Sequence, residues 1–364
     1  MIKFTFIFII LYWLVAQPKG EKAVNRYITF CAILFIAMMG LRNEAIFGDT
    51  YGYVSSFNEL SSYSLKDVLE RWEKDPVFWI TSYFLYPVIG GNYTVWLSLI
   101  AILFMFPVTK LIRKYSVEPM YSWVIFIFIG FMFFAMAGLR QTVAMGIALI
   151  GFLILFDQNR TKRNRIIWFV ALVVLASRFH GTALLCLMSL LFVDRQFGGK
   201  KVAFYLLTLV VGWLLGSSLL GDLTFFLGQY DERYLSYGED MHGSNTTYFI
   251  QQLIIVLPAL YSLRNSYKNP FVATLCHFSI IGLLFVSLSP FIAEMFRVSF
   301  YFSWANIILF PMAIKAMHKE MSALPIVYLL FFVVYLVFVN KTAWQEYYFW
   351  FENTNHIIQQ FNIG

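Results

Sequence analysis

The chain has 364 residues, of which 60% are hydrophobic and 13% are charged. Soluble domains have about half apolar and about a quarter charged residues, so this composition excludes a soluble globular protein and predicts an integral membrane protein. The net charge of +7 does not indicate nucleic-acid binding, because the excess lies in short loops where membrane topology accounts for it.

The apolar segments predict an all-α membrane protein with about 12 transmembrane helices in one domain, 1–364. The first segment has the length of a signal peptide. It lacks a strongly basic start and a small-x-small cleavage site, so we predict a retained helix. The predicted spans cover residues 3–16, 24–41, 93–109, 120–137, 140–156, 166–178, 181–193, 202–220, 247–263, 271–289, 298–314 and 323–340.

One further apolar segment, 76–91, is ambiguous, and the distribution of charge decides its prediction. If it does not cross the membrane and the amino terminus lies outside, all six basic clusters face the cytoplasm, as the positive-inside rule requires. If it crosses, the first cluster opposes the other five. We therefore predict a re-entrant or interfacial helix, with both termini outside. The six clusters begin at Lys19, Lys110, Arg160, Arg195, Arg264 and Lys315.

This topology places three sizeable segments on the outer face: the loops 42–92 and 221–246, and the carboxyl-terminal tail 341–364. In the first of them, apolar and aromatic positions recur at helical spacing over 64–74. That pattern predicts an amphipathic helix that lies on the membrane surface.

The residue types that commonly bind metals or cofactors form no known pattern in this sequence. Cys31, Cys186 and Cys276 lie singly inside apolar segments, which is typical of small core residues rather than of disulfides or metal ligands. There is no phosphate-binding glycine loop, dinucleotide fingerprint or zinc-protease motif. We therefore expect no cofactor and no metal ion.

Four arginines lie at or near the predicted outer ends of apolar segments: Arg42, Arg140, Arg178 and Arg297. A cation there opposes the positive-inside bias and is costly near hydrocarbon, so it is seldom placed without a partner. Because the planar guanidinium group suits phosphate oxygens, the four together predict a pocket for an anion, with phosphate the best fit. Taken singly, each also fits a side chain that extends to the lipid headgroups.

Three residues near these arginines are candidates for a general base. They are Asp49, His180, which follows Arg178 closely, and Glu294, which precedes Arg297. A neighbouring cation favours the neutral imidazole that can accept a proton, whereas Glu294 could simply pair with Arg297. We therefore favour His180 or Asp49 as the base, and the choice between them stays open.

Candidates for sugar binding lie beside the same positions. Tyr51 and Tyr53 follow Asp49 and are either residues of the interfacial aromatic belt or platforms that stack on sugar rings. Gln141 adjoins Arg140 and adds an amide that could bind a sugar hydroxyl.

Three short motifs follow one another on the predicted outer face. They are R-x-E-x-x-x-G-D-x-x-x-Y after the second span, G-L-R-Q at the start of a helix of small residues, and F-H-G at a later turn. The residues concerned are Arg42, Glu44, Gly48, Asp49 and Tyr53; Gly138, Leu139, Arg140 and Gln141; and Phe179, His180 and Gly181. With these motifs the chain resembles the EpsG-like and Wzy-type polysaccharide polymerase families. Those families often carry Ser or Thr after the histidine, whereas here Gly181 precedes Thr182.

The resemblance implies a metal-independent glycosyltransferase that joins oligosaccharide repeat units carried on undecaprenyl diphosphate. It implies a lipid-linked donor and a lipid-linked acceptor, and a site on the outer, periplasmic face of the bacterial inner membrane. It also implies a helical architecture related to the C-type glycosyltransferases and O-antigen ligases. A flippase and a chain-length regulator are the partner proteins that such a polymerase would have.

Two other functions stay open at this point. A flippase or transporter of lipid-linked oligosaccharides would also collect cations, but it should carry internal repeats and ionisable residues at mid-membrane. A membrane acyltransferase would use a histidine with a thioester donor, and it needs no group of outer arginines. The concentration of charged residues at the ends of the predicted spans favours the polymerase.

Overall fold

The computed structural model describes residues 2–73, 75–211, 246–289, 294–321, 323–335 and 347–352. Within these ranges the regular structure is helical, and one isolated antiparallel bridge pairs Arg42 with Phe349. The chain forms two compact units, the first comprising 1–115, 126–187 and 327–364, the second 116–125 and 188–326. The predicted outer loop 221–246 lies outside the described residues except for its last position, and so does most of the predicted tail.

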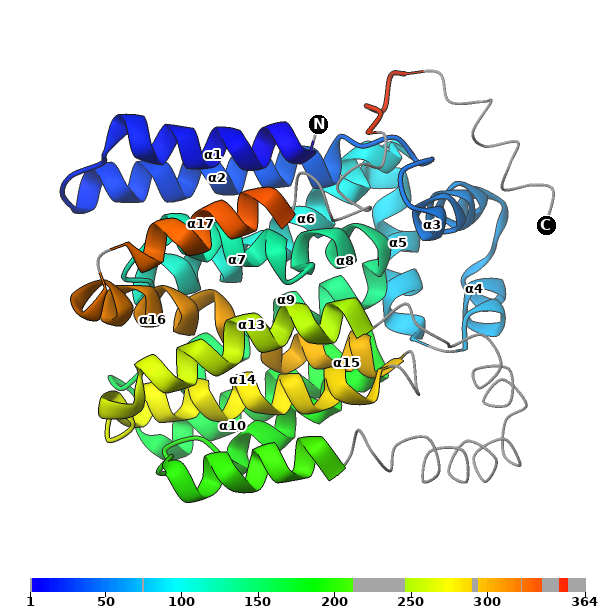
Figure 1. Cartoon of the computed structure of the whole chain (residues 1–364). Coiled ribbons are helices and arrows are strands. Elements are labelled where there is room, and N and C mark those ends of the chain that lie inside the picture. The colour runs from blue at the N-terminus through cyan, green and yellow to red at the C-terminus, as the bar shows by residue number, and fades with distance from the viewer. Residues whose placement is uncertain are drawn as a thin grey trace. The chain divides into compact units, whose positions relative to one another are not determined.

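The helices follow one another along the chain (Figure 1). The first part contains α1 (Ile2–Ala16), α2 (Glu21–Gly40), α3 (Gly48–Glu59), η1 (Leu60–Ser62), α4 (Leu65–Arg71), α5 (Pro76–Val88), α6 (Tyr93–Tyr115), α7 (Pro119–Phe128), α8 (Phe131–Ala137), α9 (Leu139–Leu155) and α10 (Lys162–Ser177). The second part contains the 3₁₀ helix η2 (Gly181–Leu191), a helix over 199–211, α13 (Thr246–Ser262), η3 (Arg264–Ser266), α14 (Pro270–Leu288), α15 (Glu294–Ser303), α16 (Asn306–Glu320) and α17 (Leu324–Val334).

In the first unit, α2 packs against α6, α6 against α9, and α9 against α10. Small residues allow the close approach: a Cβ atom at Gly146 of α9 would lie 3.0 Å from the carbonyl oxygen of Leu103 in α6. α1 and α2 run side by side (Figure 1), with the ring of Trp13 4.7 Å from that of Tyr27. This small-residue and aromatic packing is typical of apolar helices that meet one another in a membrane.

One end of the first unit gathers the starts of α2 and α10 and the ends of α6 and α9. Arg113 donates from Nη2 to Thr29 Oγ1 at 2.8 Å, which joins the end of α6 to the first half of α2. Lys114 Nζ lies 4.0 Å from the Asp157 carboxylate just after α9, and Arg165 donates to a main-chain carbonyl in the last turn of α9 at 3.0 Å. The first three basic clusters therefore share this end of the unit, named here the basic end.

The opposite end of the same helices holds both ends of α5. Asp75, directly before α5, lies 3.3 Å from Arg140 at the start of α9 and 3.0 Å from His180 beyond α10. Asn92, just after α5, caps the start of α6 by accepting a hydrogen bond from the Thr94 N–H at 3.0 Å. α5 therefore begins and ends at the same end of the unit, which is what a segment that does not cross the membrane requires.

Three helices are long and apolar enough to cross a membrane among the residues described: α2, α6 and α14. Two bent pairs pass the same test, α7 with α8 at 51° and α15 with α16 at 56°. Each of the predicted spans 120–137 and 298–314 is therefore divided into two helices. Gly130, whose φ is +77°, separates α7 from α8 because a left-handed residue cannot continue the helical hydrogen bonding. About 12 spans remains a prediction.

In the second unit, α14 packs against α13, α15 and α16. Buried polar side chains pair within this group: Ser279 Oγ donates to Asn306 Oδ1, and Asn306 Nδ2 donates to Gln252 Oε1 at 3.2 Å. Polar groups among apolar helices are stable when they bond one another, so this network fixes how α13, α14 and α16 align.

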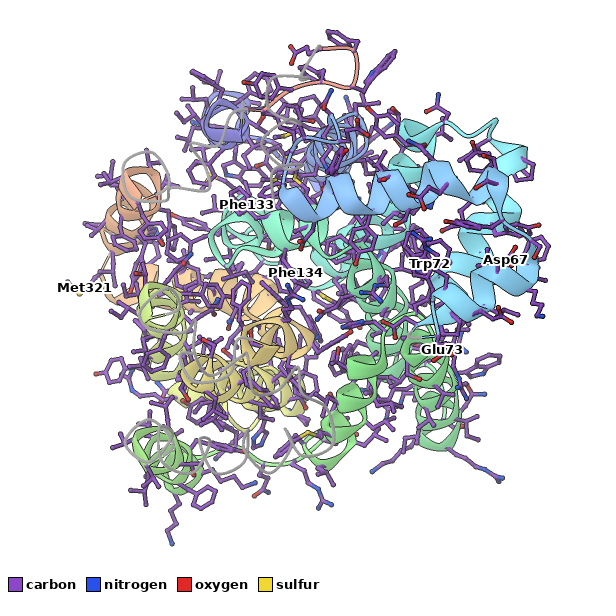
Figure 2. The ribbon with its side chains drawn as sticks, turned by 90° about the vertical axis from the view of Figure 1, so that its right-hand side faces the viewer. Asp67, Trp72, Glu73, Phe133, Phe134 and Met321 are labelled. Carbon is purple, nitrogen blue, oxygen red and sulfur yellow. The ribbon has the colours of Figure 1, made fainter. Side chains whose placement is uncertain are left out.

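The predicted amphipathic helix over 64–74 corresponds to α4, which is shorter. The Ser64 hydroxyl accepts from the Asp67 N–H while the Asp67 carboxylate accepts from the Ser64 N–H, so a capping box begins the helix. Figure 2 shows Asp67, Trp72 and Glu73 on and just after this segment. Val68 is buried while Leu69 is exposed, so the apolar face is divided between the protein and its surroundings.

Cysteine labelling tests the predicted position of α5. Glu73→Cys lies just before α5 and Val88→Cys is at its last residue, and both should react with an impermeant maleimide applied from outside the cell. Arg163→Cys, at the basic end, should react only after the membrane is made permeable. The native cysteines are buried and should give little background. Labelling of the positions at 73 and 88 from opposite sides would show that α5 crosses.

Candidate active site

The centre of the candidate site is Asp75, an acidic residue that directly precedes α5. Its backbone is in the left-handed conformation, with φ +57° and ψ +48°, and Pro76 is the first residue of the helix. Proline suits this position because the first helical N–H has no partner within the helix. The turn before α5 therefore holds the Asp75 carboxylate outside the helix, where other elements of the unit can reach it.

Three groups from two other segments donate to this carboxylate. Oδ2 lies 3.0 Å from His180 Nδ1 and 3.3 Å from Arg140 Nη1, and Oδ1 accepts from the Gly181 N–H at 3.3 Å. The Asp75 side chain is 16% exposed, His180 24% and Arg140 32%, so the group is sheltered yet open to a ligand. The three side chains are named here the Asp75 cluster.

The surroundings of Asp75 act in opposite directions on its pKa. Burial raises the pKa, while the hydrogen bond and charge of His180, the charge of Arg140 and the Gly181 N–H lower it. The lowering prevails, so the pKa of Asp75 is below its ordinary value. The carboxylate is therefore ionised at neutral pH and can accept hydrogen bonds from both side chains.

Arg140 is positioned by the G-L-R-Q motif at the start of α9. Gly138 separates α8 from α9, and a Cβ atom there would lie 2.8 Å from the end of the Phe134 ring, so a larger residue at this turn would displace that ring. The guanidinium group is held on two sides, because Nε donates to Tyr53 Oη at 3.2 Å while Nη1 donates to Asp75.

His180 lies in the turn between α10 and η2. Its own N–H donates to the Ala176 carbonyl at 3.1 Å, which continues the hydrogen bonding of α10 up to the histidine. The next residue, Gly181, begins η2 and donates to Asp75 through its main chain. The F-H-G motif thus supplies the Asp75 cluster with one ring nitrogen and one main-chain N–H.

An aromatic stack supports this cluster from α3, α4 and α5. The ring of Tyr53 lies 6.2 Å from that of Trp79, which lies 4.5 Å from that of Trp72 at the end of α4. Trp79 is buried and also stacks near Trp96 of α6, whose indole nitrogen donates to Ser82 Oγ at 3.2 Å. Because Tyr53 is packed in this way, its hydroxyl is a fixed acceptor for Arg140.

A family model matches residues 25–355 of the chain and describes the EpsG family. The chain belongs to the EpsG family. This is a family of Wzy-type polysaccharide polymerase-like proteins, so the resemblance predicted from the three motifs is confirmed. No curated protein and no solved structure matches the chain. Family membership and the apolar helices together identify a membrane protein with a role in polysaccharide synthesis.

Arg42, the first residue of the EpsG-like motif, is inside the fold and only 1% exposed. Its Nη1 donates to the Met39 carbonyl, and its Nη2 donates to the Met136 carbonyl at 2.6 Å and to Thr50 Oγ1 at 3.4 Å. Burial lowers the pKa of Arg42 to about 10. The side chain thus joins α2, α3 and α8, and its position in this EpsG-family protein is that of a structural tie rather than an open anion site.

The other predicted site residues are not among the three side chains of the Asp75 cluster, and two of them belong to the second unit. Asp49 is exposed in the first turn of α3, an element that the sequence did not lead us to expect, and Arg178 is exposed at the end of α10. Tyr51 is half-buried on α3, and Gln141 is buried on α9. In the second unit, Glu294 begins α15 and Arg297 is exposed one turn later.

Asp75 itself was missed by the sequence analysis. In the segment E-K-D-P, Asp75 is one acid among several charged residues, so its residue type gives no reason to choose it. The available signal was position, because Asp75 directly precedes the proline that begins the one apolar segment predicted not to cross. An acidic residue directly before such a segment can contact arginine and histidine side chains of neighbouring outer turns.

Proposed function

We propose that this EpsG-family protein polymerises oligosaccharide repeat units carried on undecaprenyl diphosphate. The observation that carries the proposal is the Asp75 cluster, in which one carboxylate holds both an arginine and a histidine in a partly open site. Those are the two groups the reaction needs: a cation for the diphosphate of the donor and a base for the hydroxyl of the acceptor.

His180 is the proposed general base, and Asp75 positions it. With Nδ1 donating its hydrogen to Asp75 at 3.0 Å, the neutral ring has its lone pair on Nε2. Nε2 would accept the proton of the acceptor hydroxyl as that oxygen attacks the anomeric carbon of the donor. Asp75 would then stabilise the imidazolium that forms, as a carboxylate does for histidine in other hydrolytic and transfer enzymes.

Arg140 is the proposed group for the diphosphate. Two of its nitrogens are engaged by Asp75 and Tyr53, and Nη2 donates to none of the residues that the structure describes. As the bond between the anomeric carbon and the diphosphate oxygen breaks, its electron pair stays with the leaving lipid diphosphate. A guanidinium that is already held in place stabilises this charge without reorganising during the reaction.

The position of the basic end indicates on which side of the membrane the Asp75 cluster lies. Lysines and arginines near the ends of spans favour the cytoplasm, and the Asp75 cluster lies at the opposite end of the same helices. We therefore propose that the site faces the outer, periplasmic side of the bacterial inner membrane, where Arg178 adds an exposed cation. The product would be a surface polysaccharide such as O-antigen.

The surface polysaccharide of a strain that lacks this gene tests the function. Without a polymerase, single repeat units should still reach the surface, so electrophoresis should show a short single-repeat product in place of long chains. Restoring the gene should restore the ladder of long chains. If all repeat units vanish from the surface instead, the protein supplies them rather than joining them, and a flippase would replace the polymerase proposal.

A further inference from the structure

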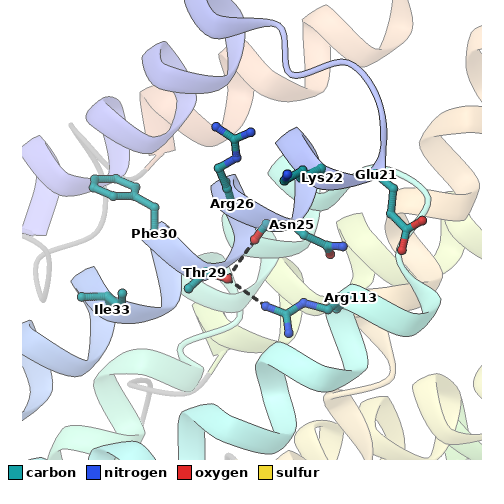
Figure 3. A pocket seen from close by; sticks show the side chains of 8 residues that line it. All are labelled: Glu21, Lys22, Asn25, Arg26, Thr29, Phe30, Ile33 and Arg113. Carbon is teal, nitrogen blue, oxygen red and sulfur yellow. Dashed lines mark hydrogen bonds between the residues drawn. The ribbon is translucent and has the colours of Figure 1, made fainter.

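A cavity of about 880 Å³ lies at the basic end of the first unit, remote from the Asp75 cluster (Figure 3). It lies over the first half of α2 and the last turn of α6. Its lining residues are Glu21, Lys22, Asn25, Arg26, Thr29, Phe30, Ile33 and Arg113. Neither the polymerase motifs nor the proposed reaction makes use of this cavity.

Three cations line the cavity from two helices. Lys22 and Arg26 extend from α2, and Arg113 from α6, while Glu21 contributes the one carboxylate. Within the described part of the chain, none of the three cations forms an ion pair with a carboxylate. Arg113 is nevertheless fixed, because it donates to Thr29 Oγ1 at 2.8 Å and that hydroxyl donates to the Asn25 carbonyl at 2.8 Å. The lining is therefore positive overall and suits an anion.

The cavity continues into an apolar strip along the same face of α2. Phe30 and Ile33 follow Arg26 by one and two turns, and their side chains are 38% and 61% exposed. Since a helix rises about 1.5 Å per residue, Ile33 lies roughly 10 Å deeper than Arg26 along a helix that is long and apolar enough to cross the membrane. The ring of Phe30 lies 5.3 Å from that of Tyr12, so α1 borders the strip.

We propose that this cavity binds an anionic phospholipid of the surrounding membrane. The headgroup phosphate would contact Arg26, Arg113 and Lys22, and one acyl chain would lie along Phe30 and Ile33. Topology alone explains basic residues in a loop, but it does not explain cations from two helices around one cavity that opens onto an exposed apolar strip. A small soluble anion would make no use of that strip.

Lipid binding to the purified full-length protein tests the proposal. Native mass spectrometry would compare adducts of dioleoyl phosphatidylglycerol with those of dioleoyl phosphatidylcholine at equal concentration. We expect the wild-type protein to prefer phosphatidylglycerol. In the variant R26Q/R113Q, two of the three cations are lost, and the affinity for phosphatidylglycerol should fall about tenfold or more.

A matched variant separates the cavity from general attraction to a basic surface. K162Q/R163Q removes two charges from the start of α10, outside the cavity, and should retain the preference. I33W keeps all charges and covers the apolar strip, so it should weaken phosphatidylglycerol binding even if R26Q/R113Q folds poorly. Equal loss in both double variants, or unchanged binding in I33W, would overturn the proposal. Tighter binding of undecaprenyl phosphate than of phosphatidylglycerol at the cavity would assign it to the carrier lipid instead.

Discussion

Asp75→Asn is expected to lower the rate of chain extension by about 10²–10⁴-fold, the contribution typical of general base catalysis. Asparagine keeps the size of aspartate and tolerates the left-handed backbone at this position, so the turn before α5 should survive. The amide has one accepting oxygen and one NH₂ donor, so it cannot accept from His180 and Arg140 on one atom and from the Gly181 N–H on the other, and it carries no charge to stabilise an imidazolium. Extension of purified lipid-linked repeats, measured as kcat and KM, checks this.

Two variants control this experiment. Glu73→Gln removes an exposed carboxylate two residues away and should leave kcat unchanged. Asp49→Asn tests the alternative acid, and because Asp49 is exposed on α3 outside the Asp75 cluster, we expect nearly full activity. His180→Ala should be as inactive as Asp75→Asn. If Asp75→Asn has the wild-type kcat and Asp49→Asn is inactive, the proposal is wrong and Asp49 has the acid–base role.

Arg140→Lys is expected to bind the lipid diphosphate about 10–100-fold more weakly than wild type. Hydrogen bonds to charged groups contribute about 1.5–3 kcal/mol, and each 1.4 kcal/mol corresponds to tenfold in affinity. Lysine keeps the charge, but a single ammonium cannot reach Asp75, Tyr53 and a phosphate oxygen in the directions of the guanidinium fork. Binding of undecaprenyl diphosphate to the purified protein checks this directly.

Arg71 provides a matched arginine for comparison. It also donates to a tyrosine hydroxyl and a carboxylate, with Nη1 2.6 Å from Tyr63 Oη and Nη2 3.0 Å from Glu59, but its side chain is half exposed on α4. Arg71→Lys should therefore bind the diphosphate lipid as tightly as wild type. If Arg140→Lys and Arg140→Ala both bind normally and extend chains at the normal rate, Arg140 is not the diphosphate group.

The sequence predicted the membrane class and most of the helices because apolar composition and length depend on local residues alone. It did not predict the breaks inside 120–137 and 298–314, since a run of apolar residues continues through both breaks. Nor did it predict α3, because apolar residues do not recur at helical spacing in that segment. Breaks and short helices of this kind arise from packing between segments, which composition does not reveal.

For the site, the sequence predicted Arg140 and His180, and the structure brings them to the same carboxylate. It grouped them with Arg42, which packing places inside the fold, and it could not identify the acid that joins them. Asp49 follows a glycine and Asp75 precedes a proline, both of which are typical of turns, so the local sequence does not distinguish them. The distinction is a long-range contact over more than a hundred residues, between Asp75 and His180.

The backbone of Asp75 has a consequence for which sequences this position can tolerate. A left-handed residue directly before proline is doubly disfavoured, and glycine, asparagine and aspartate are the residues that accept it most readily. Of the two residues that carry a carboxylate, only aspartate readily adopts this backbone conformation. Glutamate would strain the backbone, and its longer side chain would place the charge elsewhere. Glycine would relax the turn and leave His180 and Arg140 without the carboxylate that positions them. Selection for stability alone would therefore favour glycine at this position, whereas selection for the proposed polymerase activity would keep aspartate.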